Sequence, residues 1–201
     1  MSEIDDQQIH HIVQRVVSQV MGRSQVGVAP LSASPVSAAV SKPLPESKAD
    51  GGKIVALGAD HGGYELREIL RQYLTELGYD VKDMGAYNKD PVDYPDFAHE
   101  VARLVGAGKA WRGIMIDGAG IGSCIVANKV PGVRAGMAYD LSSAMNSREH
   151  NDTNLLTLGA GLIGVNLAKQ IVKTWLSTDF GGGRHAQRVD KIIAVEKQYL
   201  K

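Results

Sequence analysis

The stretch GIMIDGAGIGSCIVANK, Gly113–Lys129, decides how the rest of this chain is interpreted. It begins as an apolar run that ends in Asp117, continues as a glycine-rich turn, Gly118–Gly122, and then takes up the pattern of a helix. A carboxylate at the carboxyl end of a buried strand, beside backbone with few side chains, indicates a place where a ligand can approach closely.

Strand and helix patterns alternate from Lys53 onward. The expected strands are, in chain order, Lys53–Asp60, Asp80–Gly85, Arg112–Asp117, Val133–Tyr139 and Leu155–Gly161. Helical patterns follow them, at Tyr64–Gly78, Pro95–Val105, from the glycine turn through Asn128, Leu141–Glu149, Gly164–Leu176 and His185–Tyr199. Strands joined by helical crossovers predict an α/β fold: a three-layer sandwich with a five-stranded parallel sheet, doubly wound and Rossmann-like. Ligands of such sheets bind beyond the carboxyl ends of the strands.

Two segments precede this expected domain, which spans residues 53–201. In residues 1–22, apolar side chains recur at helical spacing from Ile9 to Val20, which predicts an amphipathic helix. Residues 23–52 are rich in Ser, Ala, Val and Pro without periodicity and are interpreted as a flexible linker. Acidic residues near the start and the lack of an apolar core argue against a mitochondrial transit peptide or a secretory signal.

Composition excludes several functional classes. Lys+Arg and Asp+Glu number 22 each, so no basic surface for nucleic acid or for a membrane is expected. The apolar runs are far shorter than the roughly 20 residues that span a bilayer. The single cysteine, Cys124, cannot form an intramolecular disulfide and fits a reducing cytoplasm. We expect it to be a buried helix residue rather than a catalytic thiol.

Three residues in the first half of the chain are candidates for binding a substrate. Asp60 and His61 close the first strand, where they could bind sugar hydroxyls and assist ring opening; alternatively, Asp60 caps the next helix. Tyr94 either lines a pocket or packs beside Pro95.

A second set of candidates lies near the end of the chain. His150 follows a helix together with Asn151, and an imidazole can both accept and donate protons near neutral pH, although a lone surface histidine ordinarily has no function. Arg184 and Arg188 are one helical turn apart, so they could bind one phosphate together or simply lie in solvent.

Five sequence blocks, taken in order, resemble the ribose-5-phosphate isomerase B and galactose-6-phosphate isomerase family. The blocks are GADHGG (58–63), DYPDFA (93–98), DGAGIGSCIVANKVPGVRA (117–135), SREHNDTN (147–154) and GGRHAQRV (182–189). The resemblance covers about Lys53–Tyr199. It implies aldose–ketose isomerisation of a phosphosugar without metal or cofactor, in the simplest case ribose 5-phosphate to ribulose 5-phosphate through an enediol(ate). It also implies a cytoplasmic homodimer, or a pair of dimers, whose active sites draw residues from both subunits.

The same resemblance implies roles for single residues. The histidine matching His150 assists ring opening, and Arg184 and Arg188 belong to the block that binds phosphate. The remaining substrate contacts that it implies are Asp60, His61, Tyr94 and Asn151, with the loop positions Gly118, Ala119, Gly120 and Gly122.

Three positions depart from the family pattern. Asp117 replaces a cysteine common among members, Ala119 replaces Thr or Ser, and Gly161 replaces an arginine that helps to hold phosphate. We predict that Asp117 is the base that moves the proton between C1 and C2, with the loop N–H groups stabilising the enediolate. The alternative is that Asp117 merely caps the loop. The missing arginine predicts weaker phosphate recognition.

Two other functions remain alternatives. Gly159–Gly164 fits the dinucleotide fingerprint G-x-G-x-x-G with Asp179 about twenty residues later. It lies too late in the chain, however, and Asp179 follows a helix instead of a strand. The stronger alternative is a catalytically degenerate homologue that binds sugar phosphates or has a structural role.

The first 22 residues and their linker resemble the encapsulation peptides of bacterial microcompartment cargo. The resemblance implies shell or core proteins as partners, and a location inside a protein-shelled compartment of the cytoplasm. So narrow an apolar stripe needs a partner surface to fold. The alternative is a helix that packs on its own domain or against its dimer mate.

Overall fold

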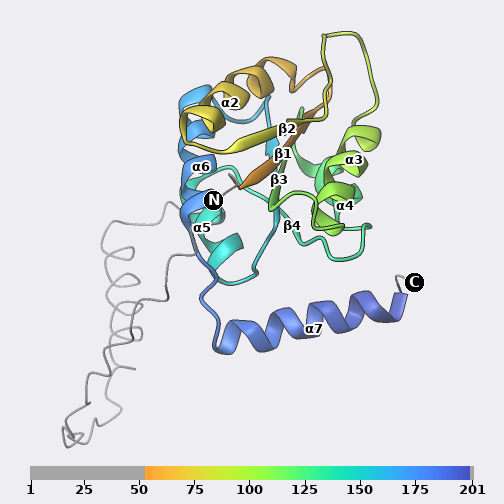
Figure 1. Ribbon diagram of the computed structural model, residues 1–201, viewed down its shortest axis with the longest axis vertical. Coiled ribbons are helices and arrows are strands. Elements are labelled where there is room, and N and C mark those ends of the chain that lie inside the picture. The colour runs from red at the N-terminus through yellow and green to blue at the C-terminus, as the bar shows by residue number, and fades with distance from the viewer. Residues whose placement is uncertain (1–52, 200–201) are drawn as a thin grey trace, which may run out of the picture. The chain divides into compact units, whose positions relative to one another are not determined.

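The computed structural model describes residues 53–199, and these lie within one compact unit, Lys48–Lys201 (Figure 1). The helix predicted for residues 1–22 and the linker predicted for residues 23–52 lie outside the described residues.

A five-stranded sheet forms the centre of the unit, and all of its neighbouring strands are parallel. Its strands are β1 (Ile54–Ala59), β2 (Asp80–Asp83), β3 (Arg112–Asp117), β4 (Ala135–Met137) and β5 (Leu155–Gly159), in the spatial order β2-β1-β3-β5-β4. The register pairs Ala59 with Ile116 and Asp117 with Gly159, so the carboxyl ends of the three central strands meet at one edge. The predicted parallel sheet is confirmed.

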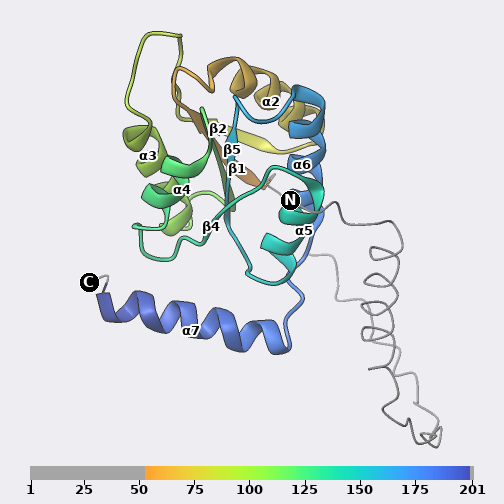
Figure 2. The ribbon, with the colours of Figure 1, turned by 180° about the vertical axis from the view of Figure 1, so that it is seen from behind.

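Helices cover both faces of this sheet (Figures 1 and 2). One layer contains α2 (Tyr64–Glu76), α5 (Leu141–Glu149) and α6 (Val165–Ser177), and the other contains α3 (Tyr94–Gly106) and α4 (Ile121–Ala127). Alternate residues of β3 serve the two layers, because strand side chains point to opposite faces. Ile114 and Ile116 pack with the first layer, whereas Met115 packs with the second. This accounts for the unbroken apolar run in the sequence.

The edge strand β4 is shorter than the predicted Val133–Tyr139. The amide side chain of Asn128, just after α4, pairs with the main chain of Ala135: Oδ1 accepts from its N–H at 2.9 Å and Nδ2 donates to its carbonyl at 3.0 Å. Cys124 is half-buried instead of fully buried, because it lies beside this same edge and donates to the Ala135 carbonyl at 3.5 Å. The side chains of Asn128 and Cys124 thus bond the open edge of β4, where a further strand would otherwise pair.

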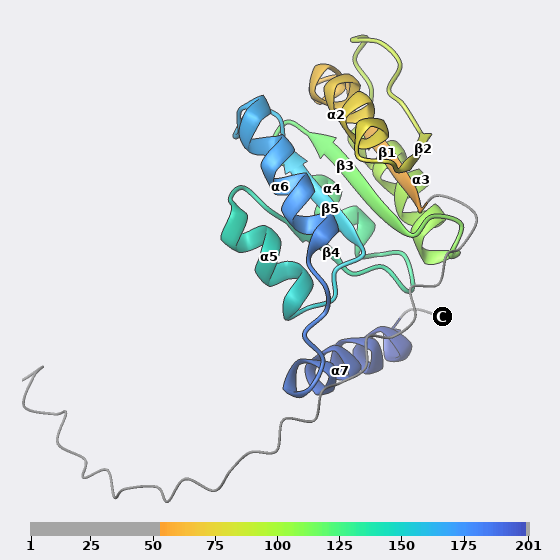
Figure 3. The ribbon, with the colours of Figure 1, turned by 60° about the vertical axis from the view of Figure 1, so that its left-hand side comes forward.

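The last helix, α7 (Arg184–Tyr199), stands apart from the two helical layers (Figure 3). Val189 is its only buried residue, while Ile192, Val195 and Tyr199 are exposed. One hydrogen bond joins α7 to the loop between α4 and β4: the Gly132 N–H donates to Glu196 Oε2 at 2.9 Å. In the described residues, α7 is therefore the element that depends least on the core of its own chain.

A buried cation joins the amino edge of the sheet to the end of α6. The Arg112 guanidinium donates to the carbonyls of Trp175 and Leu176 at 2.8 and 2.9 Å, at the helix end where the dipole favours a positive charge. It also lies 4.1 Å from the ring centroid of Trp111. Burial, with a smaller contribution from Arg148, lowers the pKa of Arg112 to about 10. The side chain remains a cation at neutral pH.

Substitution of Thr157 tests how much an unsatisfied buried hydroxyl lowers the stability of the core. It is fully buried in β5, and its Oγ1 has no hydrogen-bond partner beyond the weakly bonding thiol of Cys124. Thr157→Val keeps the shape of the side chain and removes the buried polar atom. We expect the variant to be more stable by about 1 kcal/mol, or roughly 2–4 °C in melting temperature. Calorimetry measures this; a lower melting temperature would show that the thiol is a real partner.

Candidate active site

The first strand brings Asp60 to the carboxyl edge of the sheet. Gly63, three residues later, packs tightly against β3: a Cβ at this position would lie 2.5 Å from the Ile116 carbonyl oxygen. The turn after β1 therefore contacts the end of β3 directly. Asp60 is largely buried, and its Oδ1 accepts from the Gly63 N–H at 2.8 Å. This contact closes the turn before α2 and is not the helix cap considered as an alternative for Asp60, because the N-cap residue is Gly63 and no side chain caps the helix. The other carboxylate oxygen has no bonded donor among the described residues.

His61 is exposed and contacts the loop that leads into α3. Its Nδ1 lies 3.1 Å from the Val92 carbonyl and 3.2 Å from the Val92 N–H, so the tautomer decides which of the two is the partner. Tyr94, the first residue of α3, lies over the glycine turn after β3. A Cβ at Gly122 would be 2.5 Å from the Tyr94 ring and 2.6 Å from its hydroxyl. The loop before α3 thus meets the ends of both β1 and β3.

The carboxylate of Asp117 is buried and points back into its own loop. Oδ1 accepts from the N–H groups of Ala119, at 2.8 Å, and Gly120. Oδ2 accepts from the Ser123 N–H at 3.0 Å and from the Ser123 hydroxyl. These are the contacts of a loop cap, the alternative to a catalytic base. The N–H groups of Gly118, Ile121 and Gly122 are not among the donors to Asp117.

The turn after β5 completes the carboxyl edge. The Gly161 N–H donates to the Gly118 carbonyl at 3.0 Å, and the Ala160 N–H donates to the Asp117 carbonyl at 2.8 Å. The structure therefore groups eight predicted positions around one loop: Asp60, His61, Tyr94, Asp117, Gly118, Ala119, Gly120 and Gly122. Gly161 faces the same loop without a side chain, and a Cβ there would lie 3.0 Å from the Gly118 oxygen.

The remaining predicted residues lie at the opposite edge of the sheet. Helix α5 runs from the end of β4 to His150, which precedes β5, and the Gly113 N–H at the start of β3 donates to Asn154 at 2.9 Å. At about 3.3 Å per residue, the six residues of β3 separate the two edges by about 17 Å. Within one chain, then, His150 and Asn151 are not brought together with Asp117.

The amino edge contains a histidine that sequence reasoning did not single out. The rings of His150 and His185 stack at 4.1 Å between centroids, with 8° between their planes. Asn146 Nδ2 lies 2.8 Å from His150 Nδ1. His185 sits between Arg184 and Arg188 in the block GGRHAQRV, and that position was its only signal. Burial first, then His150 and the two arginines, lower the pKa of His185.

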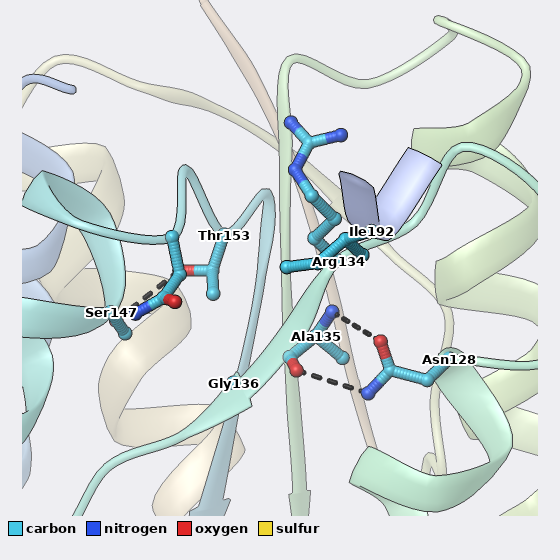
Figure 4. Close-up of a pocket in the computed structure, with 8 residues that line it drawn as sticks. Asn128, Arg134, Ala135, Gly136, Ser147, Thr153 and Ile192 are labelled. Atoms are coloured by element: carbon cyan, nitrogen blue, oxygen red, sulfur yellow. Dashed lines mark hydrogen bonds between the residues drawn. The ribbon is translucent and has the colours of Figure 1, made fainter. Parts of the chain in front are cut away.

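A cavity of about 260 Å³ opens beside these residues, between the start of β4, the end of α5 and α7 (Figure 4). Its lining comprises Asn128, Arg134, Ala135, Gly136, Ser147, Asn151, Thr153 and Ile192. Arg134 is already paired, since it donates to Asp152 Oδ2 at 2.7 Å and to the Asp152 carbonyl at 2.9 Å. Asn151 therefore lines the cavity, whereas the charge of Arg134 is already neutralised by Asp152.

Residues 53–199 contain no group of three or more His, Cys, Asp or Glu side chains that could hold a metal ion. No helix in this part of the chain is long and apolar enough to cross a membrane.

Comparison with known proteins identifies the family of this chain. The model of the family described as ribose/galactose isomerase matches residues 55–192. The chain belongs to the ribose/galactose isomerase family. Over 146 residues it is 43% identical to ribose-5-phosphate isomerase B of Escherichia coli, a match that covers 73% of this chain and 98% of that protein. It is 42% identical over 148 residues to D-erythrulose-4-phosphate isomerase of Pectobacterium atrosepticum, covering 72% and 95%.

Solved structures of the family have the same fold. Ribose-5-phosphate isomerase B of Clostridium thermocellum superposes with a TM-score of 0.72 at 49% identity, covering 73% of this chain and 99% of that one. The enzyme of Mycoplasma genitalium, solved with bound ribulose-5-phosphate, gives 0.70 at 37% identity, covering 72% and 97%. The predicted class of enzyme, a sugar-phosphate isomerase with an α/β Rossmann-like domain, is confirmed.

Proposed function

We propose that the isomerase domain interconverts ribose 5-phosphate and ribulose 5-phosphate through an enediolate. The observation that supports this most strongly is the grouping of Asp60, His61, Tyr94 and Asp117 around the glycine loop at the carboxyl edge. Ligands of parallel sheets bind at this edge. The name of the Escherichia coli relative, and the ligand bound to the Mycoplasma genitalium enzyme, favour a pentose 5-phosphate.

The roles of the groups follow from their chemistry. Asp117 takes the proton from C2 and returns it to C1, while a second proton moves from O2 to O1. The N–H groups of Gly118 and Gly122 lie outside the Asp117 contacts and face the charge that develops on the enediolate oxygen. His61 and Asp60 bind sugar hydroxyls, and His150 opens the ring. Arg184 and Arg188 bind the phosphate.

This assignment needs two copies of the chain. His150 and the arginines of α7 follow the amino edge of the sheet, whereas Asp117 ends β3 at the carboxyl edge, and the strand between these edges is about 17 Å long. We propose a homodimer in which the carboxyl edge of one subunit faces the amino edge of the other. The exposed apolar side chains of α7, Ile192 and Val195, supply surface for that contact.

Asp117→Asn tests the base. The amide keeps the shape of the side chain but cannot take a proton, so we expect isomerisation and exchange of the C2 proton with solvent to fall by at least 100-fold. Both are measured by NMR in deuterated buffer, with ribose 5-phosphate and with four- and six-carbon aldose phosphates as a panel.

Exchange at the parent rate in Asp117→Asn would show that Asp117 is only a loop cap. No turnover of any sugar by the parent chain, together with measurable equilibrium binding, would instead identify a catalytically degenerate binding protein. The missing arginine at Gly161 favours that second candidate, because it leaves the turn after β5 without a cation for phosphate.

Mixing two inactive variants tests the shared site. Asp117→Asn leaves the amino edge intact, whereas Arg184→Gln with Arg188→Gln leaves the carboxyl edge intact. In mixed dimers one of the two sites combines both intact halves, so the heterodimer purified through two different affinity tags should recover about one half of the parental activity. Either variant alone is the control. If the purified mixed dimer is as inactive as its parents, each site is built within one chain.

We further propose that residues 1–22 direct this isomerase into a bacterial microcompartment, on the basis of their apolar helical pattern and the linker that follows. Removing residues 1–48 should leave turnover and melting temperature unchanged, because the described domain has its own core. The segment fused to a fluorescent protein should co-localise with shells in a compartment-forming host. Val13→Glu with Val16→Glu, which breaks the stripe, is the control. A diffuse signal from the unaltered fusion contradicts the targeting role.

A further inference from the structure

Asp117 poses a problem for its own proposed role. A carboxylate has about four lone-pair positions, two on each oxygen. All four are occupied in this structure: two by the N–H groups of Ala119 and Gly120, and two by the N–H and hydroxyl of Ser123. A base needs a free lone pair for the incoming proton. One of the four donors must therefore leave before Asp117 can act.

Three of these donors cannot leave without unfolding the turn. The N–H groups of Ala119 and Gly120 are fixed by the loop, in which Gly120 has a φ of 80°. The N–H of Ser123 is fixed by α4 itself. The fourth donor is a hydroxyl on a short side chain, and rotation of Ser123 about its Cα–Cβ bond to another rotamer carries the hydroxyl away from Oδ2.

Ser123 also has somewhere to turn. A serine in a helix commonly donates to the carbonyl three or four residues earlier, which here belongs to Gly120 or Ala119. The Ser123 N–H donates to Asp117, so it does not occupy the Ala119 carbonyl. Ser123 is completely buried, and its hydroxyl therefore cannot touch a substrate directly.

We propose that Ser123 is a positioning residue for Asp117, and that Oδ2 takes the substrate proton as the Ser123 hydroxyl turns away. No atom or charge is added: the C2–H bond breaks, an O–H bond forms on Oδ2, and the electron pair goes to the enediolate. When the proton returns to C1, the hydroxyl donates to Oδ2 again. The inference rests on the proposed function of Asp117 and names the residue that controls it.

Ser123→Ala removes the leaving donor without adding volume. A carboxylate that has lost one donor holds a proton more tightly, so the acid side of the kcat profile should move up by about one pH unit. The KM should stay within about twofold, because Ser123 is shielded from the substrate. Ser123→Thr keeps a hydroxyl and should restore the parental profile. Thr157→Val, which removes an equally buried hydroxyl away from the carboxylate, should leave the profile unchanged.

Other titratable groups near Asp117 could also contribute to the pH dependence of kcat. They are Asp60 at the end of β1, Tyr94 over Gly122, and the Cys124 thiol, whose pKa is raised by burial. The Ser123→Ala shift should vanish in Asp60→Asn only if Asp60 titrates instead of Asp117. That result would overturn the proposal.

The remaining outcomes separate this proposal from the proposed function. If the parent isomerises sugars but Ser123→Ala changes only the melting temperature, Ser123 is structural and the proposal is wrong. If the parent neither isomerises nor exchanges the C2 proton, the proposed function fails and the role of Ser123 in it falls too. A thermal-denaturation cycle of Ser123→Ala, Asp117→Asn and the double variant then measures the contact alone. Should Ser123→Thr not fold, the Ala variant and the cycle decide the matter.

Discussion

The hydrogen bonds from one carboxylate to its own loop organise the functional edge of this domain. Asp117 ends β3, and its oxygens gather the N–H groups of Ala119, Gly120 and Ser123 into a tight turn. Against that turn lie the Tyr94 ring, from α3, and the Gly161 N–H, which follows β5. The parallel sheet supplies the platform, because it ends β1, β3 and β5 together. Loops from separate parts of the sequence therefore meet over a single side chain.

The kind of fold could be predicted because periodicity reports it directly. The unbroken apolar run of β3 requires helices on both faces, and the structure places Ile116 under one layer and Met115 under the other. The spatial order of the strands could not be read in this way, since no local pattern says that β5 lies between β3 and β4. Nor could the side-chain contact of Asn128 with the main chain of Ala135 in the edge strand β4.

The candidate site was predictable in part, for a similar reason. Strand ends placed Asp60 and Asp117 at one edge of the sheet, because parallel strands finish at the same edge, and the pairing of β1 with β3 then makes them neighbours. The sequence could not show how many donors surround Asp117. Nor did it single out Ser123, whose buried hydroxyl donates to Asp117, although it did single out the neighbouring Cys124. The stacking of His185 on His150 was equally hidden, because thirty-five positions separate them in the chain. Contacts of this kind exist only once the backbone has folded.

The placement of candidate residues on opposite edges of a rigid sheet has a consequence for symmetry. If a carboxyl edge must meet an amino edge, two copies can satisfy each other fully only with their strands antiparallel across a two-fold axis. Stacking the copies head to tail would leave one unmatched edge at each end, and such an arrangement grows into an open filament. The helix α7, which buries only Val189 against its own chain among the described residues, leaves the rest of its surface for the closed pair. Closure of the assembly and completion of the catalytic centre would then be the same event.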